Sequence, residues 1–285
     1  MDIGIRLHDT KPGTLRERLG FAREQGFTCI HLAMHKAVPG FRMQDAPKLL
    51  TEELAQEVRR AFEEAGMTCA VLGCYLKLAD PDDGAAAQTA EIYAAHLRFA
   101  RLIGARCVGT ETPPAPALAA EGAPCHTEEA YQLFLRRIRP VARRAEEEGV
   151  DLAVEPVCSH VIHDAPLAER LLRDLECDRV KIILDAVNLI DTPNTGRAEE
   201  IIDDSLRRLS GRTTVLHLKD FIPQPEEPRP KPVACGRGQM VYGGLLRLAA
   251  ERKLPITLEN TTPENAEGSR LFLERTAWEL GLSGQ

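Results

Sequence analysis

Four short apolar runs in the second half of the chain each end in a side chain that can bind a metal ion. In chain order these side chains are Glu155, Asp185, His217 and Glu259. Carboxylate oxygens and an imidazole nitrogen form a ligand set that suits Mn²⁺ and similar divalent ions. Because a buried carboxylate is costly unless it is paired or bound to a cation, this set predicts a divalent metal site rather than a structural polar cluster.

Each of these runs reads as a buried strand, and strand-like and helix-like segments alternate along the whole chain. The predicted strands span 3–7, 27–33, 68–75, 106–111, 150–155, 180–185, 213–219 and 255–259. Between them, apolar residues recur every three or four positions, which predicts helices over 13–25, 51–65, 86–103, 127–148, 165–175, 198–210, 241–253 and 264–281. This alternation is typical of an α/β fold, a single (β/α)₈ TIM barrel, in one domain over residues 1–285.

A barrel also explains why the four side chains would meet. The C-terminal ends of its parallel strands converge on one mouth, where active sites lie. Side chains alternate along a strand, so Val215, His217 and Lys219 share one face, as do Ile183 and Asp185. A doubly wound sheet is the alternative fold, but it would spread its strand ends along a line.

Two long loops, 34–48 and 220–240, follow predicted strands and therefore belong to the mouth. The second loop is stiffened by prolines at 223, 225, 228, 230 and 232. It is expected to act as a semi-rigid lid or an oligomer contact, or else as a surface loop without a catalytic role.

The composition excludes several classes of protein. The chain has 285 residues, of which 44% are hydrophobic, and its net charge of −7 argues against a nucleic-acid surface and for a small-molecule enzyme. Its eight cysteines form no CxxC pair, which suits a reducing compartment. No apolar stretch approaches the roughly 20 residues needed to span a bilayer, and no signal peptide is recognised. We expect a cytoplasmic protein with no membrane or nucleic-acid partner.

The chain resembles the xylose isomerase-like barrel superfamily, in particular the sugar phosphate isomerase/epimerase family. The matching stretches are LAVEP (152–156), ILD (183–185), LHLKD (216–220), GRG (236–238) and LEN (258–260). The resemblance implies one divalent ion, with Mn²⁺ favoured and Zn²⁺, Co²⁺ or Mg²⁺ as alternatives, held by Glu155, Asp185, His217 and Glu259. Barrels of this family often form dimers or tetramers, so a homodimer or homotetramer is expected.

The activity implied by the resemblance is that of a sugar isomerase or epimerase in carbohydrate metabolism, acting on a ketose or a sugar phosphate. Glu155 and Glu259 would move a proton beside the carbonyl through an enediolate, with the ion as Lewis acid. Five residues near the strand ends are candidates for contacting the substrate: Lys219, Asn188, His160, Glu111 and Arg237. Alternatives for three of them are a salt bridge of Lys219 with Asp220 and ordinary surface positions for His160 and Arg237.

At one position the residue type of this chain differs from the pattern of the family. Several ketose epimerases carry a histidine three residues beyond the aspartate of the sixth strand, whereas this chain has Asn188. Asparagine cannot carry a proton at neutral pH, which leaves substrate and reaction type open. A keto-inositol dehydratase, a hydroxypyruvate isomerase or a C-glycoside lyase on the same barrel are the main alternatives. A non-catalytic sugar-binding barrel and an apurinic endonuclease-like nuclease are less favoured, the latter because its additional metal-binding histidines are missing.

Overall fold

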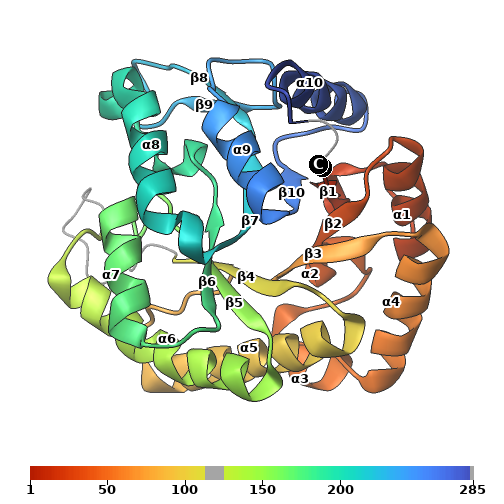
Figure 1. The fold of residues 1–285 in the computed structure, drawn as a ribbon. Helices are drawn as coiled ribbons and strands as arrows, with labels where there is room; N and C mark the ends of the chain where they lie inside the picture. The colour runs from red at the N-terminus through yellow and green to blue at the C-terminus, as the bar shows by residue number, and fades with distance from the viewer. Residues whose placement is uncertain (113–124, 283–285) are drawn as a thin grey trace.

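The computed structural model describes residues 1–112 and 125–282, and it shows a closed barrel of parallel strands surrounded by helices (Figure 1). The strands follow the order β1-β10-β7-β6-β5-β4-β3-β2 around the barrel, and β2 pairs with β1 to close it. They are β1 (Ile3–Arg6), β2 (Cys29–Leu32), β3 (Thr68–Gly73), β4 (Cys107–Glu111), β5 (Asp151–Glu155), β6 (Val180–Leu184), β7 (Thr213–Leu218) and β10 (Ile256–Leu258). The predicted (β/α)₈ barrel is confirmed; one domain over the whole chain stays a prediction.

Helices follow the strands and cover the outside of the barrel (Figure 1). The longer ones are α1 (Leu15–Glu24), α4 (Glu52–Ala65), α5 (Asp83–Ile103), α6 (Glu128–Glu148), α7 (Ala165–Leu175), α8 (Ala198–Leu209), α9 (Gly243–Arg252) and α10 (Ala266–Glu279). Helix α5 begins before the predicted residue 86 because the Asp82 side chain accepts a hydrogen bond from the backbone N–H of Ala85 and caps the helix. Within the described residues, every helix is too short or too polar to traverse a bilayer.

The inside of the barrel is filled by a small apolar cluster, separate from the larger core between the strands and the helices. Its members come from six of the strands: Cys29, Ala70, Val71, Cys107, Ala153, Ile183 and Val215. On three of these strands, the inward-facing position two residues further along carries a candidate ligand, as the alternation of side chains requires. The apolar cluster is therefore the floor on which the candidate site stands.

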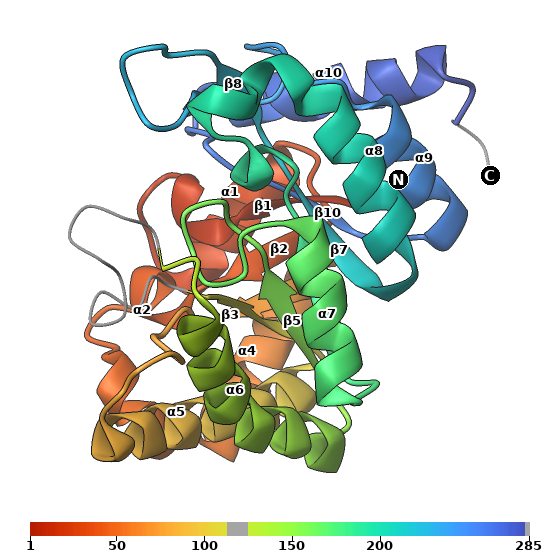
Figure 2. The same cartoon turned by 90° about the vertical axis from the view of Figure 1, so that its left-hand side faces the viewer.

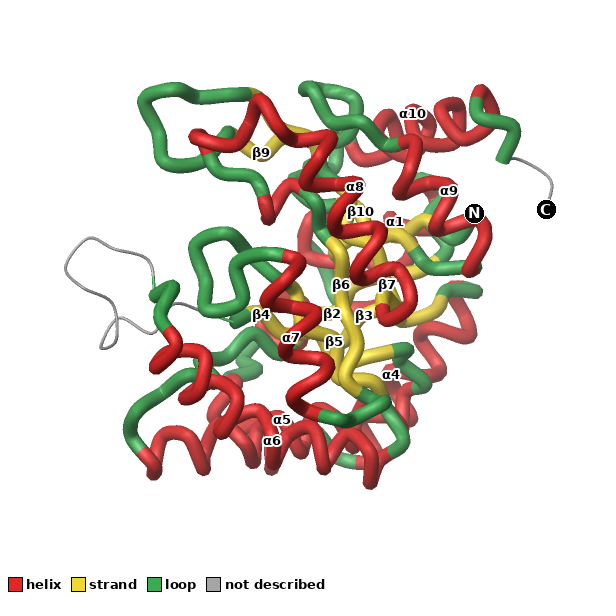
Figure 3. Tube along the Cα trace, turned by 60° about the vertical axis from the view of Figure 1, so that its left-hand side comes forward, coloured by secondary structure: helices red, strands yellow, loops and turns green. Residues whose placement is uncertain are grey.

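The two long loops after β2 and β7 contain more regular structure than the sequence predicts. Residues 34–49 hold α2 (Met34–Ala37), the 3₁₀ turn η2 (Met43–Asp45) and α3 (Ala46–Leu49). The proline-rich segment forms an antiparallel hairpin of β8 (Asp220–Ile222) and β9 (Lys231–Val233). Figures 2 and 3 show the loop between β8 and β9 projecting on the same side of the molecule as the loop after β5. Elsewhere in the described part of the chain, 3₁₀ turns form η1 (Leu7–Asp9), η4 (Val187–Leu189), η5 (Thr192–Arg197) and η6 (Ser210–Arg212).

The base of the hairpin is held by Asp220. Its carboxylate accepts backbone hydrogen bonds from Phe221, Gly236 and Met240 at 2.8–3.1 Å. At Gly238 the chain passes so close to the carbonyl oxygen of Phe221 that a Cβ atom would clash with it, so the turn requires glycine there. Asp220 thus organises the hairpin and is not the partner of Lys219.

Candidate metal centre

Four strands place the four predicted ligands at one level of the barrel. Glu155 is the last residue of β5 and His217 lies within β7, while Asp185 and Glu259 directly follow β6 and β10. All four are buried, with at most 8% of their surface exposed. One ligand atom from each lies within 4.8 Å of those of the other three. The structure therefore brings together the set that the strand ends predict.

His217 lies between two of the carboxylates. Its Nδ1 atom is 3.1 Å from Oε2 of Glu155 and 3.3 Å from Oε1 of Glu259. Neither ring nitrogen has hydrogen-bond geometry with any group among the described residues. Burial opposes the charged form of the ring, but Glu155 and Glu259 outweigh it and raise the pKa of His217 to about 9. A buried imidazole without hydrogen bonds, surrounded by acidic oxygens, matches the donor set that a divalent cation needs.

Lys219 supplies a second positive charge at this level. Its Nζ atom lies 2.8 Å from Oδ2 of Asp185 and 3.0 Å from Oε2 of Glu259. Burial raises the pKa of Asp185 to about 6, although Lys219 opposes that shift. Burial also acts against ionisation of Glu259, but Lys219 and His217 hold its pKa below the ordinary value. Lys219 thereby favours the ionised, ligand-competent form of both carboxylates.

Asn188, in η4, connects the ligands to one another. Its amide nitrogen donates to Oε1 of Glu155 at 2.7 Å, and its amide oxygen accepts from Lys219 at 2.9 Å. Two backbone N–H groups, those of Val187 and Asn188, donate to Oδ1 of Asp185. Hydrogen bonds of this kind fix the orientation of carboxylates that bind a metal.

A cavity of about 350 Å³ lies beside this cluster, and one of the four candidate ligands, Glu259, lines it. Three of the predicted substrate contacts, Glu111, Asn188 and Lys219, line it. Burial, together with Glu155 and Glu259, raises the pKa of Glu111 to about 7, so this carboxyl group can gain or lose a proton near neutrality. The cavity therefore offers both charged and proton-exchanging groups beside the candidate ligands.

The other two predicted contacts lie farther from the cavity. The Nδ1 atom of His160 is 3.8 Å from Oε2 of Glu111, and His160 is kept neutral because burial and Arg229 lower its pKa to about 4. Arg237 is exposed in the turn that Asp220 holds, and it does not line the cavity. His160 thus neighbours Glu111, which lines the cavity, but does not line the cavity itself. Arg237 also lies outside the cavity.

Two residues near the cluster are not among the residues predicted from the sequence. His31 of β2 is 2% exposed, its ring stacks on that of His217 with centroids 5.3 Å apart, and Tyr75 Oη lies 3.3 Å from its Nε2 atom. His31 comes two residues after Cys29 of the barrel floor, so the alternation of side chains along the strand could have predicted that it faces the inside of the barrel. Arg229 reaches from the hairpin loop and donates to the amide oxygen of Asn188 at 3.2 Å. Nothing in the sequence separates Arg229 from the other charged residues of that loop.

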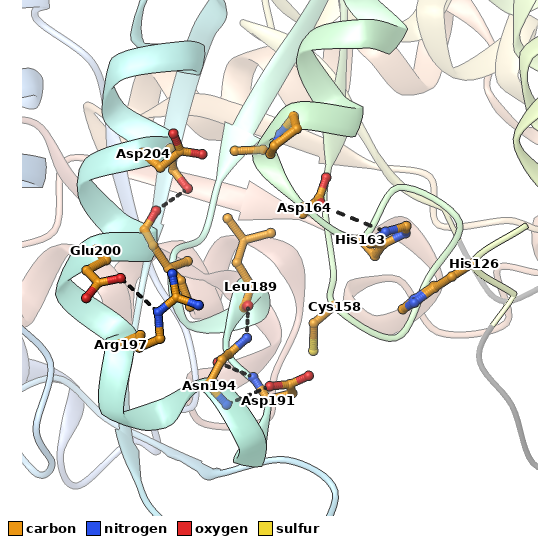
Figure 4. Close-up of a pocket in the computed structure, with 14 residues that line it drawn as sticks. His126, Cys158, His163, Asp164, Leu189, Asp191, Asn194, Arg197, Glu200 and Asp204 are labelled. Atoms are coloured by element: carbon orange, nitrogen blue, oxygen red, sulfur yellow. Dashed lines mark hydrogen bonds and ion pairs between the residues drawn. The ribbon is translucent and has the colours of Figure 1, made fainter. Parts of the chain in front are cut away.

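A second cavity, of about 380 Å³, lies between α7 and α8 and is lined by other residues (Figure 4). His163 stacks there on His126, with ring centroids 3.7 Å apart. The acidic groups around it serve local structure, since Asp164 caps α7 and Asp191 caps η5. None of the four candidate ligands lines this cavity, so the chemistry that the sequence predicts belongs to the first one.

Comparisons with known proteins agree with this fold. A family model described as xylose isomerase-like TIM barrel matches residues 19–276, whereas no curated protein matches the chain in sequence. The 3-keto-D-glucoside 4-epimerase from E. coli has a TM-score of 0.74 at 16% identity, covering 96% of this chain and 99% of that one. The probable 3-DHS dehydratase from Bacillus anthracis has a TM-score of 0.73 at 16% identity, with coverage of 96% and 99%. The IOLI protein with a binding zinc atom has a TM-score of 0.71 at 15% identity and covers 98% of each chain.

Proposed function

This chain belongs to the xylose isomerase-like TIM barrels, and we propose that it is a metal-dependent sugar isomerase or epimerase that moves a proton beside a carbonyl group. The observation that carries the proposal is the buried cluster of Glu155, Asp185, His217 and Glu259 beside a cavity of about 350 Å³ that Glu259 lines. A sugar epimerase and a zinc-containing protein among the similar structures support it.

The four clustered side chains would hold one divalent ion, for which we propose Mn²⁺. When bound, the ion acts as a Lewis acid that polarises the substrate carbonyl and lowers the energy of the enediolate. The unbonded nitrogens of His217 and the three acidic side chains around it are the feature of this chain that fits such an ion.

Glu155 and Glu259 are the proposed acid and base. They come from β5 and from the end of β10, and an oxygen of each lies within 3.3 Å of Nδ1 of His217. Asn188 orients Glu155, while Lys219 and Arg6 lie 3.0 and 3.6 Å from Glu259 and favour its ionised form. A base held ionised beside the substrate can take the proton, and a carboxylic acid opposite can return it.

Lys219, Asn188 and Glu111 are the proposed contacts to the sugar hydroxyl groups, since all three line the cavity. His160 is proposed to act through Glu111, its neighbour at 3.8 Å. A contact from Arg237 stays a prediction, because its side chain is exposed and lies outside the cavity.

The test is solvent-deuterium incorporation followed by NMR, with Mn²⁺-loaded protein and a pool of ketoses, keto-inositols and hydroxypyruvate. We expect exchange at a carbon beside a carbonyl that disappears when the metal is chelated. Absence of exchange across the pool, with Mn²⁺ binding demonstrated by titration, would contradict proton abstraction on these substrates.

A dehydratase is the second candidate, since the structure of a probable 3-DHS dehydratase is similar over 96% of this chain. Both reactions begin with loss of a proton beside a carbonyl, but only the dehydratase expels water from the next carbon. Mass spectrometry of the products separates them: a mass loss of one water indicates dehydration, and an unchanged mass with a new stereocentre indicates epimerisation.

A further inference from the structure

One wall of the 350 Å³ cavity is basic. Arg6 ends β1, His8 follows in η1, and Lys36 lies in α2, and all three line the cavity. Glu111, Lys219 and Glu259 also line the cavity, and Oε2 of Glu259 is 3.6 Å from Nη1 of Arg6. The cavity therefore has basic groups at its rim, where β1 and β2 end.

The basic wall forms a continuous row of contacts from the rim to the ligands. Lys36 Nζ lies 3.5 Å from His8 Nε2, and that nitrogen is 3.7 Å from Oδ1 of Asp9. Arg6 donates from Nε to Oδ2 of Asp9 at 2.9 Å, and its Nη1 is 3.6 Å from Oε2 of Glu259. A molecule with its reacting carbon at Glu259 can therefore extend along this row toward Lys36.

Lys36 differs from the other cations of the site. Arg6 and Lys219 are each paired with carboxylates, whereas no ion pair joins Lys36 to a carboxylate within residues 1–112 and 125–282. Its neighbour His8 is neutral, because burial, Lys36 and Arg6 lower its pKa to about 3. Nδ1 of His8 is buried without a hydrogen-bond partner. The rim thus presents the Lys36 ammonium group, which has no carboxylate partner among the described residues, beside a neutral imidazole.

We propose that the substrate carries an anionic group, a carboxylate or a phosphate, that binds to Lys36 at the rim of the cavity, beside His8. A charge-assisted hydrogen bond from Lys36 favours an anionic ligand over its neutral analogue by roughly tenfold or more. The placement of the other end of the substrate at Glu155 and Glu259 rests on the proposed function. The anion site itself rests only on the contacts of Lys36, His8 and Arg6.

The experiment compares three ligands that lack a carbonyl group and so cannot react: D-glucitol, D-gluconate and D-glucitol 6-phosphate. Their dissociation constants are measured by calorimetry on Mn²⁺-loaded and on metal-free protein. The test variant is Lys36→Gln, which keeps a polar side chain and removes the charge. The matched control is Lys48→Gln in α3, an exposed lysine outside the cavity.

We expect one anionic ligand to bind roughly tenfold or more tightly than D-glucitol, and this preference to disappear in Lys36→Gln but not in Lys48→Gln. Preference for the phosphate or for the carboxylate identifies the source of the negative charge. Equal affinity for all three ligands, or a preference that survives in Lys36→Gln, would overturn the proposal. A preference seen without deuterium exchange on any sugar would instead leave the anion site intact and contradict the proposed reaction.

Discussion

The inside of this barrel has two layers of opposite character, built by the same strands. The lower layer contains Ala153, Ile183 and Val215, which belong to the apolar cluster. The upper layer begins two positions further along the same strands. Its residues there are Glu155, Asp185 and His217, all within 1% of full burial. A step of two residues keeps a side chain on the same face of a strand, so the layers differ in chemistry and not in direction.

The contrast separates what stabilises the fold from what serves its chemistry. Burial of the lower layer removes apolar surface from water and favours folding by about 25 cal/mol per Å². Burial of the upper layer removes carboxylates from water, which opposes folding unless cations compensate. Lys219 and His217 provide that compensation within the protein. The proposed catalytic layer therefore depends on the stability that the apolar floor supplies.

The largest expected effect comes from removing one upper-layer charge. Asp185→Asn keeps the shape of the side chain but replaces a charged ligand oxygen by an amide, so we expect Mn²⁺ affinity to fall by at least about 100-fold and deuterium exchange to be lost. Titration calorimetry with Mn²⁺ measures this. Asp203→Asn, at an exposed position of α8, is the control. Unchanged Mn²⁺ affinity in Asp185→Asn would remove Asp185 from the proposed site.

The corresponding change in the lower layer is expected to reduce stability instead. Ile183→Ala leaves a cavity in the barrel floor, which lowers the free energy of unfolding by about 2–5 kcal/mol. Chemical denaturation of the metal-free protein measures that loss, and Mn²⁺ titration of the folded variant should give the wild-type affinity. The separation of the two layers is wrong if the folded Ile183→Ala variant no longer binds Mn²⁺.

A smaller effect is expected where a residue only orients the ligands. Asn188→Ala removes the hydrogen bond to Glu155 and the acceptor for Lys219, so Mn²⁺ affinity should fall roughly 10- to 100-fold without loss of binding. Asn188→Asp is the companion variant, because it keeps an acceptor for Lys219 but places a further negative charge beside Glu155. Should both variants bind Mn²⁺ as the wild type does, Asn188 would have no part in positioning the ligands.

Local patterns in the chain were enough to predict the barrel and the meeting of the four candidate ligands. Strand and helix periods set the order of the elements, and alternation placed His217 above Val215 and Asp185 above Ile183. The hairpin of β8 and β9 escaped prediction, because its pairing depends on contacts across the loop such as Asp220 with Gly236 and Met240. Short segments with several prolines carry no strand pattern of their own.

The level of the four candidate ligands in the barrel was thus already present in the order of residues, since every strand of a parallel barrel ends at the same mouth. The neighbours of those ligands were not. Barrel closure sets Lys219 against Asp185 and Glu259 rather than beside Asp220, places His31 on His217, and directs Arg229 instead of Arg237 toward Asn188. These contacts join residues far apart in the chain, and local periodicity holds no information about the distance between them.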